Sequence, residues 1–92
     1  MRICEVIGSV TLSRAHSSLQ GASWRCAVPL SPPKARGGKP VRGEPLIVFD
    51  EYGAGVGAAI AVSEGAEASA AFYPDQKPID AYNAAILDTY EF

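Results

Sequence analysis

Short runs of alternating apolar and polar residues, separated by segments rich in glycine, proline and serine, recur along this 92-residue chain. The first run splits into two sets, one on each face of an extended strand: Cys4, Val6, Gly8, Val10 and Leu12, and opposite them Glu5, Ser9 and Thr11. A period of two is typical of a β-strand, and the glycine in its middle predicts a bulge or a tight bend. The pattern therefore predicts an all-β fold of short strands.

Four further strands are predicted, over residues 23–30, 46–50, 58–63 and 85–91, with 13–22 as a connection. The second strand also alternates, with Trp24, Cys26, Val28 and Leu30 on one face and Ser23, Arg25 and Ala27 on the other. Alanine-rich residues 66–71 predict about two turns of helix, and Asp80 is placed to cap one more helical turn. Five short strands with one short helix predict a small barrel similar to an OB-fold.

The length fits one domain over residues 1–92. A chain this short buries only roughly 60–65% of the surface that it exposes when unfolded, so its stability as a monomer is marginal. Its two cysteines cannot build a disulfide framework, and no cluster of metal ligands is evident. We therefore expect oligomerisation to supply the missing stability.

The formal charge of −2 hides a strong asymmetry. Residues 1–43 carry a net charge of +6 and residues 44–92 carry −8. Four of the basic residues lie in the segment 31–45, which also holds four prolines and three glycines and has no apolar period. We expect a flexible basic loop there. It is interpreted as a solvated connection, a protein contact or a nucleic-acid contact, and the last is disfavoured because no aromatic residue in it can stack on a base.

The densest motif is DEYGAGVGA over residues 50–58, with three glycines at alternating positions. As a string it matches the dinucleotide-binding fingerprint, and Asp75 follows about twenty residues later. That fingerprint needs a long helix directly after the loop, whereas here Glu64 and Gly65 follow after only six residues. We favour a structural role, because glycines let backbones approach closely at an oligomer axis or around a narrow opening.

Catalytic chemistry has little support in the sequence. His16 is the only histidine and lies in a serine-rich segment, where a polar surface residue is the default. Ser17 and Ser18 beside it form no triad, since one loop cannot hold nucleophile, base and orienting group in place. Cys4 and Cys26 have no metal-ligand spacing with His16. We expect no enzyme activity, no metal and no cofactor.

The sequence predicts neither a signal peptide nor a membrane partner. Residues 1–6 include Glu5 and have no long apolar core, and no stretch approaches the ~20 apolar residues that span a bilayer. Cys4 and Cys26 lie in apolar surroundings, as reduced core thiols do. We therefore expect a cytoplasmic protein.

Motifs across nearly the whole chain resemble the EutN/CcmL family of microcompartment shell vertex proteins. The matching segments occur in the family's order: CEVIGSVT at 4–11, LQG at 19–21, VFDEYGAGVG at 48–57, VSEG at 62–65 and PIDAYNAAILD at 78–88. Each motif alone is weak, but their combination and spacing are specific.

The resemblance implies a barrel that assembles as a homopentamer. Such pentamers cap the vertices of the polyhedral shell of a bacterial microcompartment, whose flat facets are hexameric shell proteins. It implies a structural role in which one loop lies at the subunit interface and pore, through Asp50, Gly53, Ala54, Gly55, Val56 and Gly57. Asp50 is expected to fix the turn by accepting backbone N–H bonds. Interface or shell contacts are further expected from Arg14, Arg25, Tyr90 and Phe92.

Two other interpretations stay open from the residues alone. One is an OB-like module that binds single-stranded nucleic acid through the basic loop, and the other is an accessory subunit that stabilises an unrelated enzyme. The charge split between the two halves favours head-to-tail pairing of identical subunits, which is the pairing that a closed ring requires.

Overall fold

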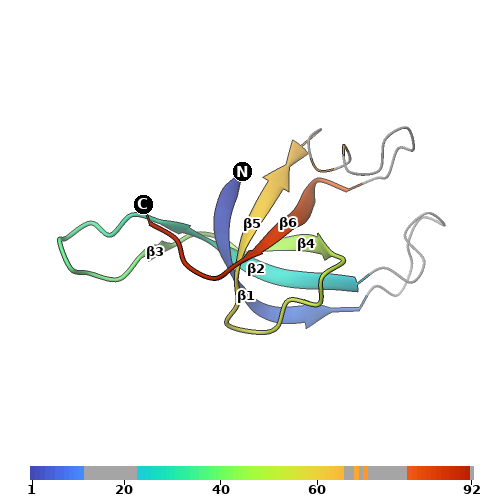
Figure 1. Ribbon diagram of the computed structural model, residues 1–92, viewed down its shortest axis with the longest axis horizontal. Coiled ribbons are helices and arrows are strands. Elements are labelled where there is room, and N and C mark those ends of the chain that lie inside the picture. The colour runs from blue at the N-terminus through green and yellow to red at the C-terminus, as the bar shows by residue number, and fades with distance from the viewer. Residues whose placement is uncertain (12–22, 66–67, 69, 71–78, 92) are drawn as a thin grey trace.

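The computed structural model describes residues 1–11, 23–65, 68, 70 and 79–91, and these are nearly all β (Figure 1). Within those ranges lie six strands: β1 (Arg2–Val10), β2 (Ser23–Ser31), β3 (Val41–Arg42), β4 (Leu46–Asp50), β5 (Ala59–Glu64) and β6 (Ala81–Leu87). The first four predicted strands are confirmed to within two residues, as β1, β2, β4 and β5. The short β3 lies inside the segment predicted as a loop.

Five of the strands close into a barrel. Their hydrogen-bonded order is β1-β5-β6-β4-β2, and β2 pairs again with β1. All of these pairs are antiparallel except β4 with β6, which is parallel and places Phe49 opposite Tyr82. This closed five-stranded order is the OB-like barrel that the sequence predicts, and closure leaves its five strands without an unpaired edge.

Strand β1 pairs with both β5 and β2 because it bends. Its N-terminal half pairs with β5, from Arg2 opposite Val62 to Glu5 opposite Ala59, and nearly its whole length pairs with β2. The register with β2 shifts between Val6 and Gly8. The residue between Val6 and Gly8 has no partner in β2. Such an extra residue forms a β-bulge, which bends a strand and increases its twist. The bulge predicted at this glycine is confirmed.

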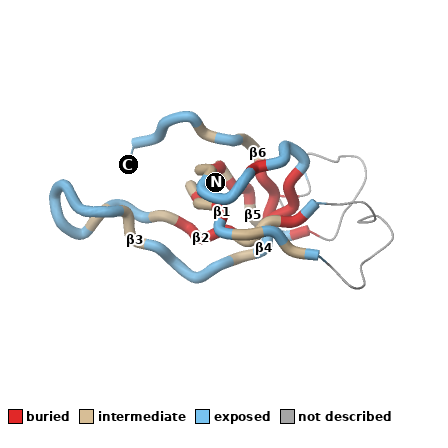
Figure 2. Tube along the Cα trace, turned by 90° about the horizontal axis from the view of Figure 1, so that it is seen from below, coloured by how far each residue is buried: buried red, intermediate tan, exposed pale blue. Residues whose placement is uncertain are grey.

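Buried residues lie along the strands of the barrel, whereas the hairpin between β2 and β3 is mostly exposed (Figure 2). The buried residues form two clusters. The interior cluster contains Cys4, Val6, Ala27, Val48, Ala54, Ile60, Val62 and Ala81. The second cluster contains Trp24, Phe49, Ala68, Ile79 and Tyr82. Alternate residues of a strand point to opposite faces, so β2, β4 and β6 each contribute to both clusters. The predicted apolar face of β2 is confirmed only in part: Trp24 is buried in the second cluster, but Ala27, from the opposite face, is buried in the interior cluster opposite Val6.

The prediction for the C-terminal part was wrong in two respects. Asp80 lies at a bend and caps no helical turn, and β6 runs from Ala81 to Leu87 rather than over 85–91. Alanine favours a helix in isolation, but here β5 offers a partner strand, from Glu64 opposite Ala81 to Ala59 opposite Leu87. Cross-strand pairing and burial outweigh local propensity in such a case.

Some predictions fall outside the described residues: the connection at 13–22 and most of the helix at 66–71. At the start of that segment Gly65 has a φ of +63° and ends β5, as expected of a glycine there. In the part of the chain that is described, no helix has the length and apolar character to cross a membrane.

Candidate functional site

The connection between β4 and β5, residues 51–58, is here called the glycine loop. Gly53 and Gly57 have φ values of +75° and +91°, which residues with a side chain rarely adopt. The far end of the loop is tied to β1, because the Gly57 N–H donates to the Val6 carbonyl at 2.8 Å and the Val6 N–H donates to the Ala58 carbonyl at 2.9 Å. The loop therefore has a fixed course across one end of the barrel.

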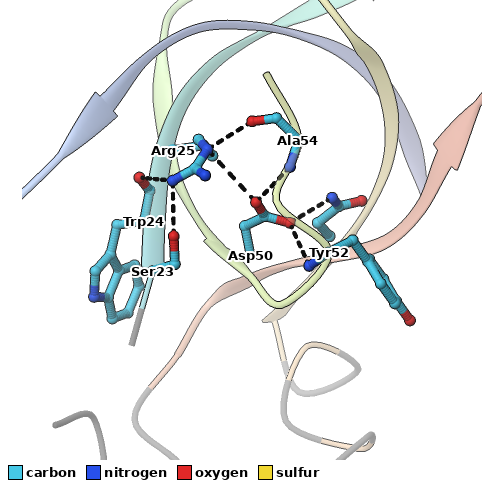
Figure 3. Close-up of polar contacts among 7 residues, drawn as sticks. Ser23, Trp24, Arg25, Asp50, Tyr52 and Ala54 are labelled. Atoms are coloured by element: carbon cyan, nitrogen blue, oxygen red, sulfur yellow. Dashed lines mark hydrogen bonds and ion pairs between the residues drawn. The ribbon is translucent and has the colours of Figure 1, made fainter. Parts of the chain in front are cut away.

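Asp50 holds the beginning of the glycine loop (Figure 3). Its Oδ1 accepts the Tyr52 N–H at 3.0 Å, and its Oδ2 accepts the Ala54 N–H at 2.8 Å. The Asn83 amide of β6 donates to Oδ1 at 2.9 Å. Asp50 and Asn83 are both buried, so the carboxylate obtains from the chain the hydrogen bonds that water would otherwise supply. The turn-fixing role predicted for Asp50 is confirmed.

Arg25 pins the same loop from β2. Its Nε donates to the Ala54 carbonyl at 2.7 Å and lies 3.5 Å from Asp50 Oδ2. Its Nη1 donates to Ser23 Oγ at 2.8 Å and to the Trp24 carbonyl at 3.1 Å (Figure 3). Ala54 is thus held through both its N–H and its carbonyl, and it is only 1% exposed. All of these contacts of the Arg25 guanidinium are with groups of its own chain.

These surroundings keep Asp50 ionised. Burial by itself raises the pKa of Asp50, but the hydrogen bonds from Asn83, Tyr52 and Ala54 and the charge of Arg25 together outweigh it. The pKa of Asp50 therefore lies below its usual range. A carboxylate held in this way is a poor proton donor or acceptor near neutral pH, and its function is to hold the loop in place.

The exposed surface of the glycine loop consists of its glycines and of the side chains of Glu51, Tyr52 and Val56. Tyr52 is 55% exposed and Val56 is 75% exposed. Gly55, between them, has no positive φ, and a Cβ added to it would meet no atom within 4 Å. Within the described residues, the backbone therefore favours glycine at 53 and 57, whereas position 55 has room for a Cβ.

A second support of the loop comes from β6. The Tyr82 hydroxyl donates to Glu51 Oε1 at 3.0 Å, and the Tyr82 ring stacks on Phe49 with centroids 6.1 Å apart. The Phe49 ring in turn packs against the Trp24 ring in a T-shaped arrangement, with centroids 5.3 Å apart. Burial and the neighbouring Glu51 raise the pKa of Tyr82, so its hydroxyl keeps its proton.

Sequence reasoning missed Asn83 and Tyr82 as loop supports. The available signal was the polar Asn83 within the otherwise largely apolar run AYNAAIL at 81–87, since a buried amide needs a polar partner. A helical turn was predicted near Asp80, so the last strand was predicted to begin only at Ala85, and Asn83 was not assigned to a strand.

The other predicted contact residues are placed in different ways. Tyr90 lines a shallow pocket of about 210 Å³ with Glu5, Leu30, Lys39, Pro40 and Arg42. Arg14 and Phe92 lie outside the described residues, as do His16, Ser17 and Ser18. The structure contains one chain and shows no contact of Tyr90 or Arg25 with a second subunit, so their interface roles stay predictions.

The two cysteines are free thiols on different parts of the barrel. Cys4 is buried in the interior cluster, and this burial raises the pKa of its thiol. Cys26 is half-buried on β2. Across residues 1–11, 23–65, 68, 70 and 79–91, no three His, Cys, Asp or Glu side chains come together as ligands for a metal ion.

The sequence pattern of the family described as ethanolamine utilisation protein EutN/carboxysome matches residues 1–88. Among solved structures, the GrpN pentameric microcompartment shell protein from Rhodospirillum rubrum is 30% identical, with a TM-score of 0.78 over 100% of this chain and 99% of that one. CcmL from Nostoc sp. PCC 7120 is 26% identical over 98% and 92% of the two chains, with a TM-score of 0.79.

CcmL from Gloeobacter violaceus is 25% identical over 100% of this chain and 90% of that one, with a TM-score of 0.81. A comparison with curated proteins finds no match. The likeness to the solved structures thus covers the whole barrel together with the glycine loop.

Proposed function

The chain belongs to the EutN/CcmL family, and from this membership we propose that five copies form a ring that caps a vertex of a bacterial microcompartment shell. The single observation that carries the proposal is the full-length match to a pentameric microcompartment shell protein at 30% identity. Microcompartments lie in the bacterial cytoplasm, so this is where we place the protein.

The proposed role is one of shape. A layer of hexagonal tiles is flat, and it closes into a polyhedron only when pentagons occupy its corners. A five-membered ring uses heterologous contacts, in which one face of each subunit meets a different face of the next and the rotation closes. The solved relatives are named as shell proteins, and we propose a structural role without enzyme activity for this chain. Its neighbours in the shell would be hexameric shell proteins.

The glycine loop is the surface that we propose for the subunit boundary near the five-fold axis. Three features support this: the exposed Tyr52 and Val56, the glycine at 55, where the described chain has room for a Cβ, and the anchoring of the loop by Asp50 and Arg25. A loop that is already ordered loses little conformational entropy when it is buried in a contact, and preorganisation of this kind increases affinity.

The proposal is tested by shell closure. Purified hexameric shell proteins alone are expected to form sheets, tubes or incomplete particles in electron micrographs, and adding this protein is expected to give closed polyhedra. Localising a tagged copy at the corners would identify it as the vertex component. Closed particles that form equally well without it, or a tag found on the facets, would contradict the proposed function.

The nucleic-acid alternative is not favoured. The family match is to shell proteins, and residues 31–45 contain no aromatic side chain that could stack on a base. Binding of single-stranded DNA at low salt that is lost at high salt is the result that would revive it.

A further inference from the structure

The hairpin that joins β2 to β3, residues 32–40, projects from the barrel and is here called the basic arm (Figure 1). Its base is built by β3, where Val41 pairs with Ser31 and Arg42 pairs with Leu30. Its tip is closed by a hydrogen bond from the Gly38 N–H to the Ala35 carbonyl at 2.9 Å. Prolines at both ends restrict the backbone further. The arm therefore presents its side chains from a defined hairpin.

The charges of the arm differ from those of the barrel. Arg2, Arg25 and Arg42 each lie within 4 Å of a carboxylate of the same chain, namely Glu64, Asp50 and Glu5. Among the described residues, the bases without such a partner are the three that the arm carries, Lys34, Arg36 and Lys39. All three are exposed. The arm is thus a patch of uncompensated positive charge.

The rest of the chain has the opposite surplus. Within the described ranges, five exposed carboxylates lack a basic side chain within 4 Å: Glu44, Glu51, Asp80, Asp88 and Glu91. The formal charge of the whole chain is −2, so identical subunits brought together in a ring repel one another on average. A positive arm placed on the acidic surface of the next copy would offset this repulsion.

We propose that the basic arm of each subunit lies against exposed carboxylates of the adjacent copy and so acts as an electrostatic clamp between neighbours in the ring. The proposal rests on the ring of the proposed function and names a contact within it. Four residues of nearly extended chain reach about 13 Å, so the two-stranded arm is long enough to cross a subunit boundary. Arm and carboxylates are different surfaces, as a heterologous contact requires.

A protein partner fits the arm better than a nucleic acid does. The arm offers three cations but no aromatic ring, whereas modules that bind single strands combine a basic groove with stacking platforms. The negative formal charge of the chain also disfavours a polyanion. Carboxylates of a second copy match the arm in charge and are present at high local concentration once a ring has formed.

The first test is cross-linking of the assembled protein with a zero-length carbodiimide, which joins a lysine amine to a carboxylate only when the two touch. Rings mixed from 14N- and 15N-labelled subunits distinguish links between copies from links within one copy. We expect mixed-isotope links from Lys34 or Lys39 to an acidic residue of 44–92. Links confined to one copy, or none in a ring whose mass is that of five subunits, would overturn the clamp and leave the pentamer standing.

The second test compares Lys34→Glu with Arg2→Glu, which change the net charge equally at exposed positions. Arg2 pairs with Glu64 of its own chain, so its reversal serves as the matched control. Each exposed ion pair contributes little to the free energy of association. The triple reversal K34E/R36E/K39E is therefore used to remove all the charge contacts of the arm at once. We expect it to raise the subunit dissociation constant about tenfold at low salt, with a much smaller change near 1 M salt, where charges are screened within about 3 Å.

Three outcomes would count against the clamp. They are an equal effect of Lys34→Glu and Arg2→Glu, a triple variant that dissociates like the wild type at every salt concentration, and arm cross-links that form only to an added hexameric shell protein. In the last case the arm binds another partner, and the ring itself is unaffected. A wild-type protein that forms no ring would refute the proposed function instead.

Discussion

The glycine loop and the basic arm both leave the barrel as connections, but they are held by different forces. The loop is anchored by a buried carboxylate, a buried amide and an arginine that is largely enclosed. The arm is anchored only at its base, and its three cations face solvent. The glycine loop therefore presents a fixed shape, and the basic arm presents charge. Contacts of the first kind tolerate salt, whereas contacts of the second kind weaken with it.

The largest expected effect is on the anchor of the loop. Asp50→Ala removes the acceptor for Tyr52, Ala54 and Asn83 and leaves Arg25 without its nearby anion. Breaking a buried pair from one side costs about 3 kcal/mol or more, which lowers the melting temperature of a domain this size by roughly 12 °C or more. Thermal unfolding followed by circular dichroism measures it.

The arm provides the control for that experiment. Lys34→Ala removes an exposed charge without an intrachain partner, so its unfolding free energy should stay within about 0.5 kcal/mol of the wild type. If the melting temperatures of Asp50→Ala and Lys34→Ala were equally close to that of the wild type, the glycine loop would be no better anchored than the solvated arm.

The next effect separates folding from assembly within the loop itself. A Cβ added at Gly55 meets nothing within 4 Å in the described chain, so Gly55→Val should retain the strand content, and we expect the added side chain to overpack a close subunit contact. Overpacking costs about 1–3 kcal/mol, so subunit association should weaken about tenfold or more. Size-exclusion chromatography and circular dichroism on the same sample provide the two readouts.

Gly53→Val is the matched variant, because Gly53 has a φ of +75°. The same side chain there should destabilise the monomer itself by about 1–2 kcal/mol. Equal losses of folding stability at positions 53 and 55, or normal assembly of Gly55→Val, would argue against the glycine loop as a subunit contact.

A smaller effect is expected with pH. The folded-state pKa of Asp50 is lowered relative to that in the unfolded chain, so its contribution to stability is complete above the unfolded value of about 3.9. That contribution is lost as the pH falls from there through the lower folded-state pKa. Urea unfolding at pH 6, 4 and 3 should therefore show the gap between the wild type and Asp50→Asn narrowing with acid. A gap that widens with acid would contradict the assigned direction of the shift.

The smallest effect sharpens the comparison between paired and unpaired surface bases. Arg2 makes two hydrogen bonds to Glu64, at 2.5 and 2.6 Å, but half of its side chain is exposed. Arg2→Ala should therefore cost only about 0.5 kcal/mol of unfolding free energy, and high salt should reduce even that. A loss near that of Asp50→Ala would mean that exposure does not distinguish these ion pairs.

The sequence predicts well what is local and poorly what depends on distant partners. Residues 46–50 form a compact apolar run and are found as the strand β4 with those bounds, and the link from Asp50 to Ala54 spans four residues, within reach of a turn rule. Arg25 and Asn83 meet the same carboxylate from 25 and 33 residues away. No local pattern encodes those meetings, because they are products of barrel closure.

The two strands that were misjudged follow the same logic. The start of β6 has helical propensity and becomes a strand only because β5 lies beside it. The two residues of β3 have no period of their own, and they are strand because the end of β2 pairs with them. In both cases the deciding contact is tertiary.

Native mass spectrometry of the purified protein shows whether identical barrels close around a five-fold axis. With a subunit of 9.6 kDa, we expect a dominant species of five chains, near 48 kDa, that persists at cellular concentrations. A dominant 9.6 kDa monomer, or rings of an even number of chains, would contradict it.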